Sequence, residues 1–274
     1  VWAVGDKGYI GHYDGTKWTD IPSGTTANLN TVFAVSSTEV YAGGDNRTLL
    51  RYLGTSWAPY PNPLPSNLIQ DVRGLWASGS ANIWGVGSAA VGASAANNFW
   101  VWDATGSWKV YDIKDPTVGM NRVTTVNGIW GTSQAGTTIT FFAGKNYTAV
   151  VNLGAGMLLY TFLASGNELR AIYGTSGTDV WAVGDGGAVQ HYDGTWTSMI
   201  TGLGVANLNA VWRLNGTSDV WIAGDAGTVW KYDGTAWAAK ESNTRNKLQA
   251  ISGISATDLW VGGASGTMLH TQPQ

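Results

Sequence analysis

The sequence contains no cysteine, which excludes disulfide bonds and thiolate metal sites. Charged residues are also scarce: they make up 12% of the 274 residues, and the net charge is −3. A strongly basic surface for nucleic acid is therefore not expected. No apolar run approaches the roughly 18 residues that a membrane-spanning helix needs, so membrane insertion is not expected either.

Glycine and tryptophan are abundant instead, with 38 Gly and 16 Trp. This composition indicates many tight turns with large flat side chains between them. One phrase nearly repeats: VWAVGDKGYIGHYDG opens the chain, VWAVGDGGAVQHYDG starts at residue 180 and VWIAGDAGTVWKYDG at residue 220. Such internal similarity is typical of an array of small structural units.

Seven copies align on an aromatic residue three positions before a glycine. They read VWAVG, VYAGG, IWGVG, TFFAG, VWAVG, VWIAG and LWVGG, and start near residues 1, 40, 83, 140, 180, 220 and 259. A period near 40 residues is typical of a β-propeller blade. We expect an all-β fold, a single β-propeller domain over residues 1–274 with seven blades of four antiparallel strands. The first and last blades look incomplete, so we expect the natural chain to continue upstream.

Residues 208–239 show how one unit reads. The segments LNAVW, VWIAG, TVWKY and AWAAK are rich in β-branched and aromatic residues and have the usual length of strands. Asp-Gly between the third and fourth segments predicts a type I′ hairpin turn. The glycine that ends the second segment fits a position needing positive φ or close backbone approach. Helical periodicity is nearly absent.

These units resemble bacterial β-propeller repeat proteins whose repeat reads roughly VWAVGDxGTILHYDGTxW. The YDGTKW and YDGTAW stretches are also distantly similar to the Asp-box repeats of sialidase-like propellers, although the glycine follows the aspartate directly here. Propellers of this kind include many lectins, so the resemblance implies sugar binding. It also implies that ligands bind at the face where the loops entering the first strand and joining the second to the third strand open.

Catalysis usually needs one singular constellation, but the polar residues here recur. The three histidines, His12, His191 and His270, occupy one point of the repeat, and most aspartates fall at repeated turns. No metalloprotease, serine-hydrolase, phosphate-loop or EF-hand motif occurs. We therefore expect no catalytic residues, no bound metal and no cofactor, and favour a non-catalytic protein.

A polar residue stands second in each inner strand, between apolar neighbours. These residues, together with the aspartates that follow the second strands, form the first candidate ligand site: Asn30, Arg73, Asn127, Arg170, Asn209, Gln249, Asp6, Asp45, Asp185 and Asp225. Either they bind a sugar, peptide or anion, or they line a water-filled channel and satisfy backbone groups there. Arg73 and Arg170 suit a carboxylate or phosphate.

The strongest departure from the repeat lies between residues 88 and 168, where insertions lengthen two loops. This region gives the second candidate site: Trp100, Trp102, Tyr111, Asp115 and Arg122. The two tryptophans also fit a role in the strand core.

The sequence favours a secreted or cell-surface bacterial propeller that binds carbohydrate. Exposed aromatic rings could stack on sugars, and several weak sites would gain from multivalency. The fourth-strand tryptophans Trp18, Trp57, Trp108, Trp196 and Trp237 could serve this purpose or pack against the adjacent blade. The alternative is a protein-interaction scaffold, and a third possibility is a hydrolase or lyase with its site in residues 88–168. The expected partner is thus a glycan or a surface protein.

Overall fold

The structure is a computed structural model of the 274-residue chain. It describes residues 1–60, 69–79, 82–89, 99–102, 107–111, 125–134, 137–145, 147–152, 157–162, 168–199, 202 and 204–271. Of the second candidate site, Asp115 and Arg122 lie outside the described residues.

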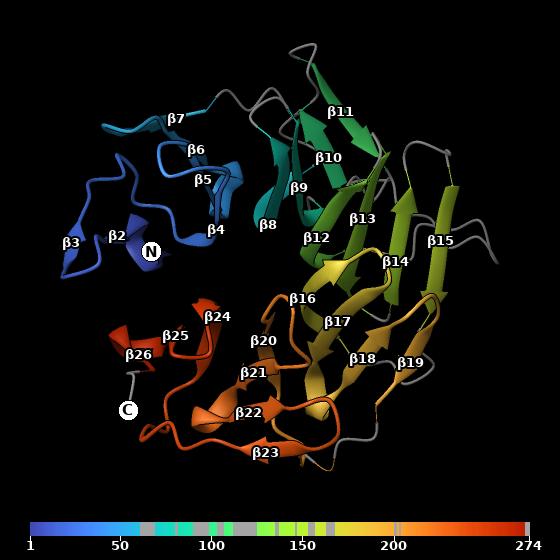
Figure 1. Ribbon diagram of the computed structural model, residues 1–274. Coiled ribbons are helices and arrows are strands. Elements are labelled where there is room, and N and C mark those ends of the chain that lie inside the picture. Colours follow the sequence, from blue (N-terminus) through green and yellow to red (C-terminus); the bar gives the residue numbers. More distant parts are fainter. Residues whose placement is uncertain are drawn as a thin grey trace. The chain divides into compact units, whose positions relative to one another are not determined.

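The described residues form seven small antiparallel sheets, whose strands follow one another in chain order (Figure 1). Five sheets have four strands, and the first and last have three. In the first three sheets the strands are β1 Trp2–Val4, β2 Ile10–Tyr13 and β3 Trp18–Asp20; β4 Leu29–Ala34, β5 Val40–Gly44, β6 Leu49–Tyr52 and β7 Trp57–Pro59; and β8 Ile69–Gly79, β9 Asn82–Ala89, β10 Phe99–Trp102 and β11 Trp108–Tyr111.

The other four sheets repeat this plan. Their strands are β12 Val126–Gln134, β13 Thr137–Gly144, β14 Tyr147–Asn152 and β15 Met157–Phe162; β16 Leu169–Ser176, β17 Asp179–Gly184, β18 Val189–Tyr192 and β19 Trp196–Ser198; β20 Leu208–Arg213, β21 Val220–Gly224, β22 Val229–Tyr232 and β23 Trp237–Ala239; and β24 Leu248–Ser255, β25 Asp258–Gly263 and β26 Met268–His270. In the first sheet, β1 and β2 correspond to the second and third strands of the other sheets. Counted in this way, short turns join the second strand to the third in five sheets: η1 Asp6–Gly8, η2 Asp45–Arg47, η3 Asp185–Gly187, η4 Asp225–Gly227 and η5 Ala264–Gly266. The prediction of an all-β chain is confirmed.

Two compact units divide the chain, residues 1–138 and residues 139–274. The division falls at the second strand of the fourth sheet. Within the first unit, the inner strand β4 packs against β8, and β8 packs against β12; within the second unit, β16 packs against β20 and β20 against β24. The sequence prediction of a single domain stays a prediction.

The core of each unit lies between successive sheets. The second strands are its centre: Val40, Tyr41 and Ala42 of β5 are completely buried, and so are Val180 and Ala182 of β17. These strands have neighbours on both sides in their own sheet and on both faces, so nearly all of their apolar surface leaves water. Burial of this kind stabilises by roughly 25 cal/mol per Å².

The glycines that end the second strands are needed for close approach, not for positive φ. Gly44, Gly184 and Gly224 have φ between −159° and −170°, which any residue can adopt. A Cβ atom on each would instead overlap the carbonyl oxygen of the residue that precedes the neighbouring inner strand. Of the two roles that the sequence left open, close approach therefore holds at these three positions.

The type I′ turn is not in the Asp-Gly hairpin where the sequence predicts it. Asp14 does not have positive φ, and only Gly15 of that hairpin does, at 107°. The preceding turn has the type I′ signature, with φ of 57° at Lys7 and 73° at Gly8 and a backbone hydrogen bond from Tyr9 to Asp6. The reason is side-chain chemistry. The Asp14 carboxylate accepts hydrogen bonds from the Thr16 and Lys17 N–H groups and so closes a wider loop.

Candidate functional site

Each inner strand begins beside the turn that follows the second strand, so the polar side chains of these two places lie at the same end of their sheet. In the register, Leu29 stands opposite Gly44 and Leu208 stands opposite Gly224. This places Asn30 beside Asp45 and Asn209 beside Asp225, as the strand positions predict. We call these contacts the turn-end network.

In the second unit the turn-end network runs through several successive residues. Arg170 Nε donates to Asp185 Oδ1 at 2.5 Å, and Arg170 also donates to Asn209 Oδ1 at 3.3 Å. Asn209 Nδ2 donates in turn to Asp225 Oδ1 at 2.8 Å and to the Leu248 carbonyl oxygen at 2.9 Å. Asn207 Nδ2 donates to the other Asp225 oxygen at 3.0 Å. One network thus joins three sheets of this unit.

Asp225 accepts hydrogen bonds at both of its carboxylate oxygens. Hydrogen bonds from Asn209 and then from Asn207, together with the positive charges of Lys247 and Arg170, lower the pKa of Asp225 below its ordinary value. The group stays ionised at neutral pH and serves as an acceptor. A carboxylate with a depressed pKa and no proton to give is suited to binding donors, not to acid catalysis.

In the first unit the same pattern recurs, except that Arg73 contacts an asparagine and not an aspartate. Asn30 Nδ2 donates to Asp45 Oδ1 at 2.9 Å and to the Val72 carbonyl oxygen at 3.2 Å, and Asn28 Nδ2 donates to Asp45 Oδ2 at 3.0 Å. In the next sheet Arg73 donates to Asn127 Oδ1 at 3.2 Å. The hydrogen-bonding groups therefore link successive inner strands here too.

Two members of the first candidate site stand apart. Within the described part of the chain, neither the Asp6 carboxylate nor the exposed Gln249 side chain takes part in the turn-end network. The remaining members satisfy one another and backbone carbonyls, which the sequence left open as the alternative to ligand binding. Both N–H groups of Asn30 Nδ2 are used by Asp45 and Val72, so exposed Asn30 can offer a ligand its amide oxygen, whereas exposed Arg73 also keeps donors for one.

The second candidate site is largely core where the structure describes it. Trp100 is completely buried, and Trp102 packs against the same apolar cluster as Tyr41 and Leu75. For Tyr111 only the backbone, at the end of β11, is described. The Trp100 ring therefore has no surface on which a ligand could stack.

The fourth-strand tryptophans pack between sheets. Trp57, only 7% exposed, meets the Trp2 ring of the preceding sheet edge-on at 5.4 Å. Trp237 meets Trp181 at 6.1 Å in the same way, and Trp196 meets Phe141 at 6.5 Å. One rule covers all three: the fourth-strand ring of a sheet packs on the second-strand aromatic ring of the sheet before it.

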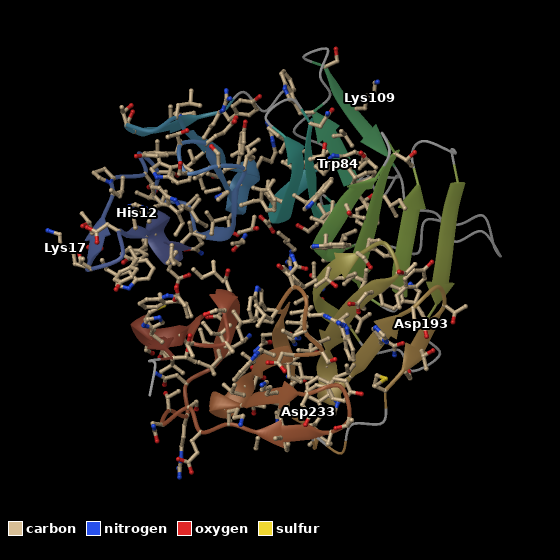
Figure 2. All side chains as sticks on the ribbon, in the orientation of Figure 1. His12, Lys17, Trp84, Lys109, Asp193 and Asp233 are labelled. Carbon is tan, nitrogen blue, oxygen red and sulfur yellow. The ribbon has the colours of Figure 1, made fainter. Side chains whose placement is uncertain are left out.

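The histidines belong to the same repeated packing. His12 stacks on Trp2 at 4.2 Å, His191 on Trp181 at 4.1 Å and His270 on Trp260 at 3.9 Å. His191 and His270 are also paired with Asp179 and Asp258, at 3.0 and 2.9 Å. Burial lowers the pKa of His12. Figure 2 labels His12 on β2. The recurrence of the stack in three sheets indicates a structural role.

The strongest of these clusters surrounds Asp179. Its carboxylate accepts hydrogen bonds from Arg213 at 2.6 Å, Thr175 at 2.6 Å, His191 at 3.0 Å and Trp181 Nε1 at 3.1 Å. Burial by itself would raise the pKa of Asp179, but the hydrogen bonds from His191 and Thr175 and the charge of Arg213 outweigh it and lower the pKa. Glu39 plays the equivalent part in the second sheet, between Tyr41 and Arg51.

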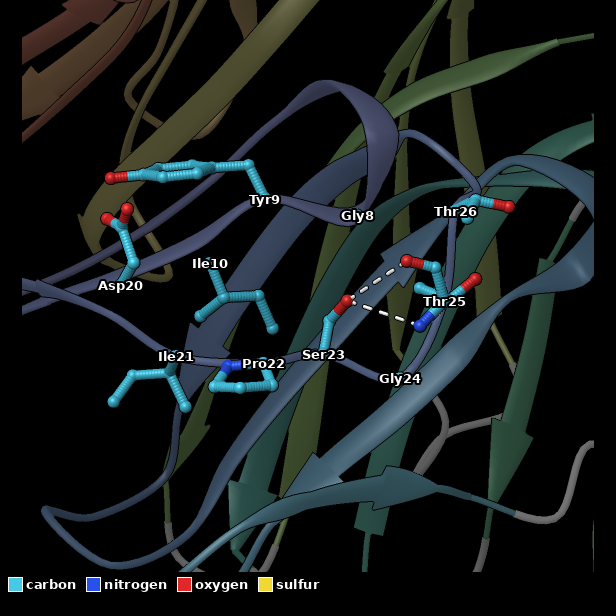
Figure 3. Close-up of a pocket in the computed structure, with 10 residues that line it drawn as sticks. All are labelled: Gly8, Tyr9, Ile10, Asp20, Ile21, Pro22, Ser23, Gly24, Thr25 and Thr26. Carbon is cyan, nitrogen blue, oxygen red and sulfur yellow. Dashed lines mark hydrogen bonds between the residues drawn. The ribbon is translucent and has the colours of Figure 1, made fainter.

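An open cavity of about 710 Å³ lies in the first unit beside η1, and no feature of the sequence predicted it. Figure 3 shows Tyr9 and Asp20 on one side and the Ser23–Thr26 segment on the other. Ser23 Oγ is occupied by the Thr25 backbone, donating to its carbonyl oxygen at 3.2 Å and accepting from its N–H at 3.3 Å. The same Ser-x-Thr turn recurs at Ser242 and Thr244, so it is part of the repeat.

No protein-family model matches the chain, and no curated protein sequence matches it either. Solved structures do match. YCF48 from Cyanidioschyzon merolae aligns with a TM-score of 0.74 and 18% identity over 99% of this chain and 91% of that one. Virginiamycin B lyase from Staphylococcus aureus aligns with a TM-score of 0.72 and 14% identity over 97% of this chain and 92% of that one. Both are seven-bladed β-propellers. This chain has the β-propeller fold.

A third match widens the range of roles among proteins of this fold. The extracellular domain of the one-component system BT4673 from B. thetaiotaomicron aligns with a TM-score of 0.70 and 17% identity, over 98% of this chain and 38% of that one. YCF48 has also been solved bound to D1 peptide, and that structure aligns with a TM-score of 0.70 and 15% identity over 100% of this chain and 88% of that one. At these identities the likeness shows the fold alone. The predicted β-propeller is confirmed.

Within the described residues, no group of three or more His, Asp or Glu side chains could hold a metal ion. No helix in the described part of the chain is long and apolar enough to cross a membrane.

Proposed function

We propose that this protein is a non-catalytic binding module that holds a peptide segment of another protein at the turn-end network of its first unit. The network carries amide donors, guanidinium donors and carboxylate acceptors side by side, which is the mixture that a peptide backbone and its polar side chains can use. Asn30 and Arg73 are exposed at this end of their sheets. A propeller of this fold, YCF48, has been solved with a peptide bound, which supports the choice of ligand.

The observation that carries the proposal is where the aromatic rings lie. Carbohydrate binding, which the sequence favours, calls for exposed rings on which sugars can stack. Trp57, Trp196 and Trp237 are instead packed on rings of the preceding sheets. The repeated groups that remain available are hydrogen-bonding ones, and these favour a peptide over a stacked sugar.

Peptide and glycan arrays probed in parallel with the purified chain test this proposal. We expect peptide hits, one bound peptide per chain by calorimetry, and about tenfold weaker binding in Asn30→Ala, which removes the exposed amide from the turn-end network of the first unit. Lys17→Ala is the matched control because Lys17 is exposed in the hairpin at the opposite end of its sheet (Figure 2). Glycan hits with several ligands per chain and no peptide hits would overturn the proposal in favour of carbohydrate binding.

A further inference from the structure

The residue after the second-strand glycine is an aspartate in four of the seven sheets, whereas it is Ser88 in the third, Lys145 in the fourth and Ala264 in the last. Asp45, Asp185 and Asp225 occupy this position in the second, fifth and sixth sheets, and each accepts a hydrogen bond from the polar residue of its own inner strand. In the third sheet, Val72 stands opposite Gly87, so the equivalent residue is Ser88. Ser88 brings no charge, and its hydroxyl donates to Asp71 Oδ2 at 3.0 Å.

This replacement changes the state of Arg73. Arg170, at the equivalent place in the fifth sheet, is paired with Asp185 at 2.5 Å. Arg73 has no such partner: its one contact within the described residues is the neutral amide oxygen of Asn127, at 3.2 Å. A guanidinium carries five N–H donors, so most of those on Arg73 face no acceptor among the residues that the structure describes.

The contrast extends to other arginines. Arg51 is paired with Glu39 and Arg213 with Asp179, so these two arginines, like Arg170, have a carboxylate partner. Asp71 does not take that place for Arg73. Its two oxygens are held by Ser88 and by the Asn46 backbone N–H, and no ion pair with Arg73 occurs. Arg73 is thus an exposed cation, and the turn beside it presents Ser88 where the turn beside Arg170 presents Asp185.

We propose that Arg73 is the anchor for a carboxylate of the bound peptide, taking the place that Asp185 fills for Arg170. A planar carboxylate matches the fork of guanidinium donors. A phosphate, with close to two negative charges, would also meet Asp71, so the single charge of an Asp or Glu side chain or of a C-terminus fits better. This inference rests on the proposed function and names the ligand chemistry at one point of its site.

Two substitutions test the anchor from opposite sides. Arg73→Gln removes the cation, and Ser88→Asp restores the acid of the repeat, which should pair with Arg73 as Asp185 pairs with Arg170. Glu168 stands at the place of Asp71 in the fifth sheet, so a neighbouring acid does not prevent that pairing. Ser88→Asn is the matched control, because it changes size and polarity but adds no charge. Thermal unfolding of all three establishes that each is folded.

The probe is an array of synthetic peptides, each present in an acidic form with Asp or Glu and in an amide form with Asn or Gln. C-terminally amidated copies distinguish a side-chain carboxylate from a terminal one. We expect the strongest binders to be acidic, with affinity falling about threefold to tenfold in both Arg73→Gln and Ser88→Asp and unchanged in Ser88→Asn. The amide form of a binder should lose little further affinity in Arg73→Gln, since its partner is already gone.

Peptides that bind the wild-type chain and both charge variants equally would overturn the anchor while leaving the proposed function standing. A phosphorylated form that binds wild-type chain much more tightly than the Glu form would overturn the carboxylate assignment. If no peptide binds at all, the proposed function and the anchor fall together.

Discussion

Removing the Asp179 side chain should destabilise this protein more than removing any acid with one partner. In Asp179→Ala, the Arg213 guanidinium and the His191 ring lose a shared acceptor, and the nearly buried Trp181 loses the acceptor of its indole N–H. The carboxylate is only 19% exposed, so water can replace its contacts in part but not in full. Groups left without partners in such a place incur a desolvation cost.

The magnitude follows from the contacts. Four hydrogen bonds at about 1 kcal/mol each give an upper figure near 4 kcal/mol. Partial access of water reduces it, so we expect a loss of about 3 kcal/mol, at the low end of what breaking a buried ion pair costs. At about 2–4 °C per kcal/mol for a chain of this size, the midpoint of thermal unfolding should fall by roughly 6–12 °C.

Thermal unfolding followed by circular dichroism measures this, with Asp219→Ala as the control. Asp219 is at the same place in the next sheet and is equally buried, but its carboxylate is paired with Lys231 alone, at 2.7 Å. Its loss should cost about 1 kcal/mol. If the two variants unfold at the same temperature, the reasoning from shared contacts is refuted.

The pH dependence has a definite sign. The pKa of Asp179 is lowered in the folded protein, so its contribution is present above the unfolded value near 3.8 and is lost as the pH falls through the lower folded value. The difference in stability between wild type and Asp179→Ala should therefore be constant near neutral pH and shrink below about pH 4.

Three further outcomes are expected. Gly44→Ala should lower the free energy of unfolding, measured by chemical denaturation, by about 1–3 kcal/mol, because the new Cβ atom would overlap the Asn28 carbonyl oxygen just before the inner strand. Gly5→Ala is the matched control and should be nearly neutral, because the atom nearest to its Cβ lies 3.9 Å away. The hydrogen bond from the Thr235 side chain is the main reason why the pKa of Asp233 is lowered to about 2. In Thr235→Val, the pKa of Asp233 followed by NMR should therefore rise. The stability that the ionised Asp233 contributes above about pH 3.8 should then be lost at a higher pH than in the wild type. Trp57→Ala should cost about 3–5 kcal/mol, and an unchanged unfolding midpoint would show that this ring is a surface platform after all.

The repeat was enough to predict most of the architecture. A second strand pairs with a strand on each side and is covered on both faces, so nearly all of its residues must be apolar. The apolar segment VWIAG and its copies therefore identify the second strands in the sequence. Their spacing fixed the number of sheets. The turn-end network was also foreseeable in part, since register alone brings Asn30 to Asp45 and Arg170 to Asp185. Ser88 at the place of an acid is visible in the aligned copies, and that signal was missed.

Other features needed the folded chain. A Trp suits a sugar platform and an apolar core equally well by composition, and only the neighbouring sheet decides which it is. The turn types were misassigned because Asp next to Gly can close a wider loop through its own carboxylate, as Asp14 does with Thr16. The cavity beside η1 depends on how the Ser23–Thr26 segment passes that turn. The repeat pattern identifies the strands but does not show that this loop segment and the turn lie side by side.

The sequence by itself determined the strands, their order and the end of each sheet at which polar groups gather, because these follow from periodicity and from the local geometry of short antiparallel strands. Tertiary structure alone decided which of these groups contact one another across neighbouring sheets. Arg73 and Arg170 are alike in the sequence of their strands, and they differ because the charge of an arginine is balanced by whatever the adjacent turn presents, Asp185 in one sheet and Ser88 in the other.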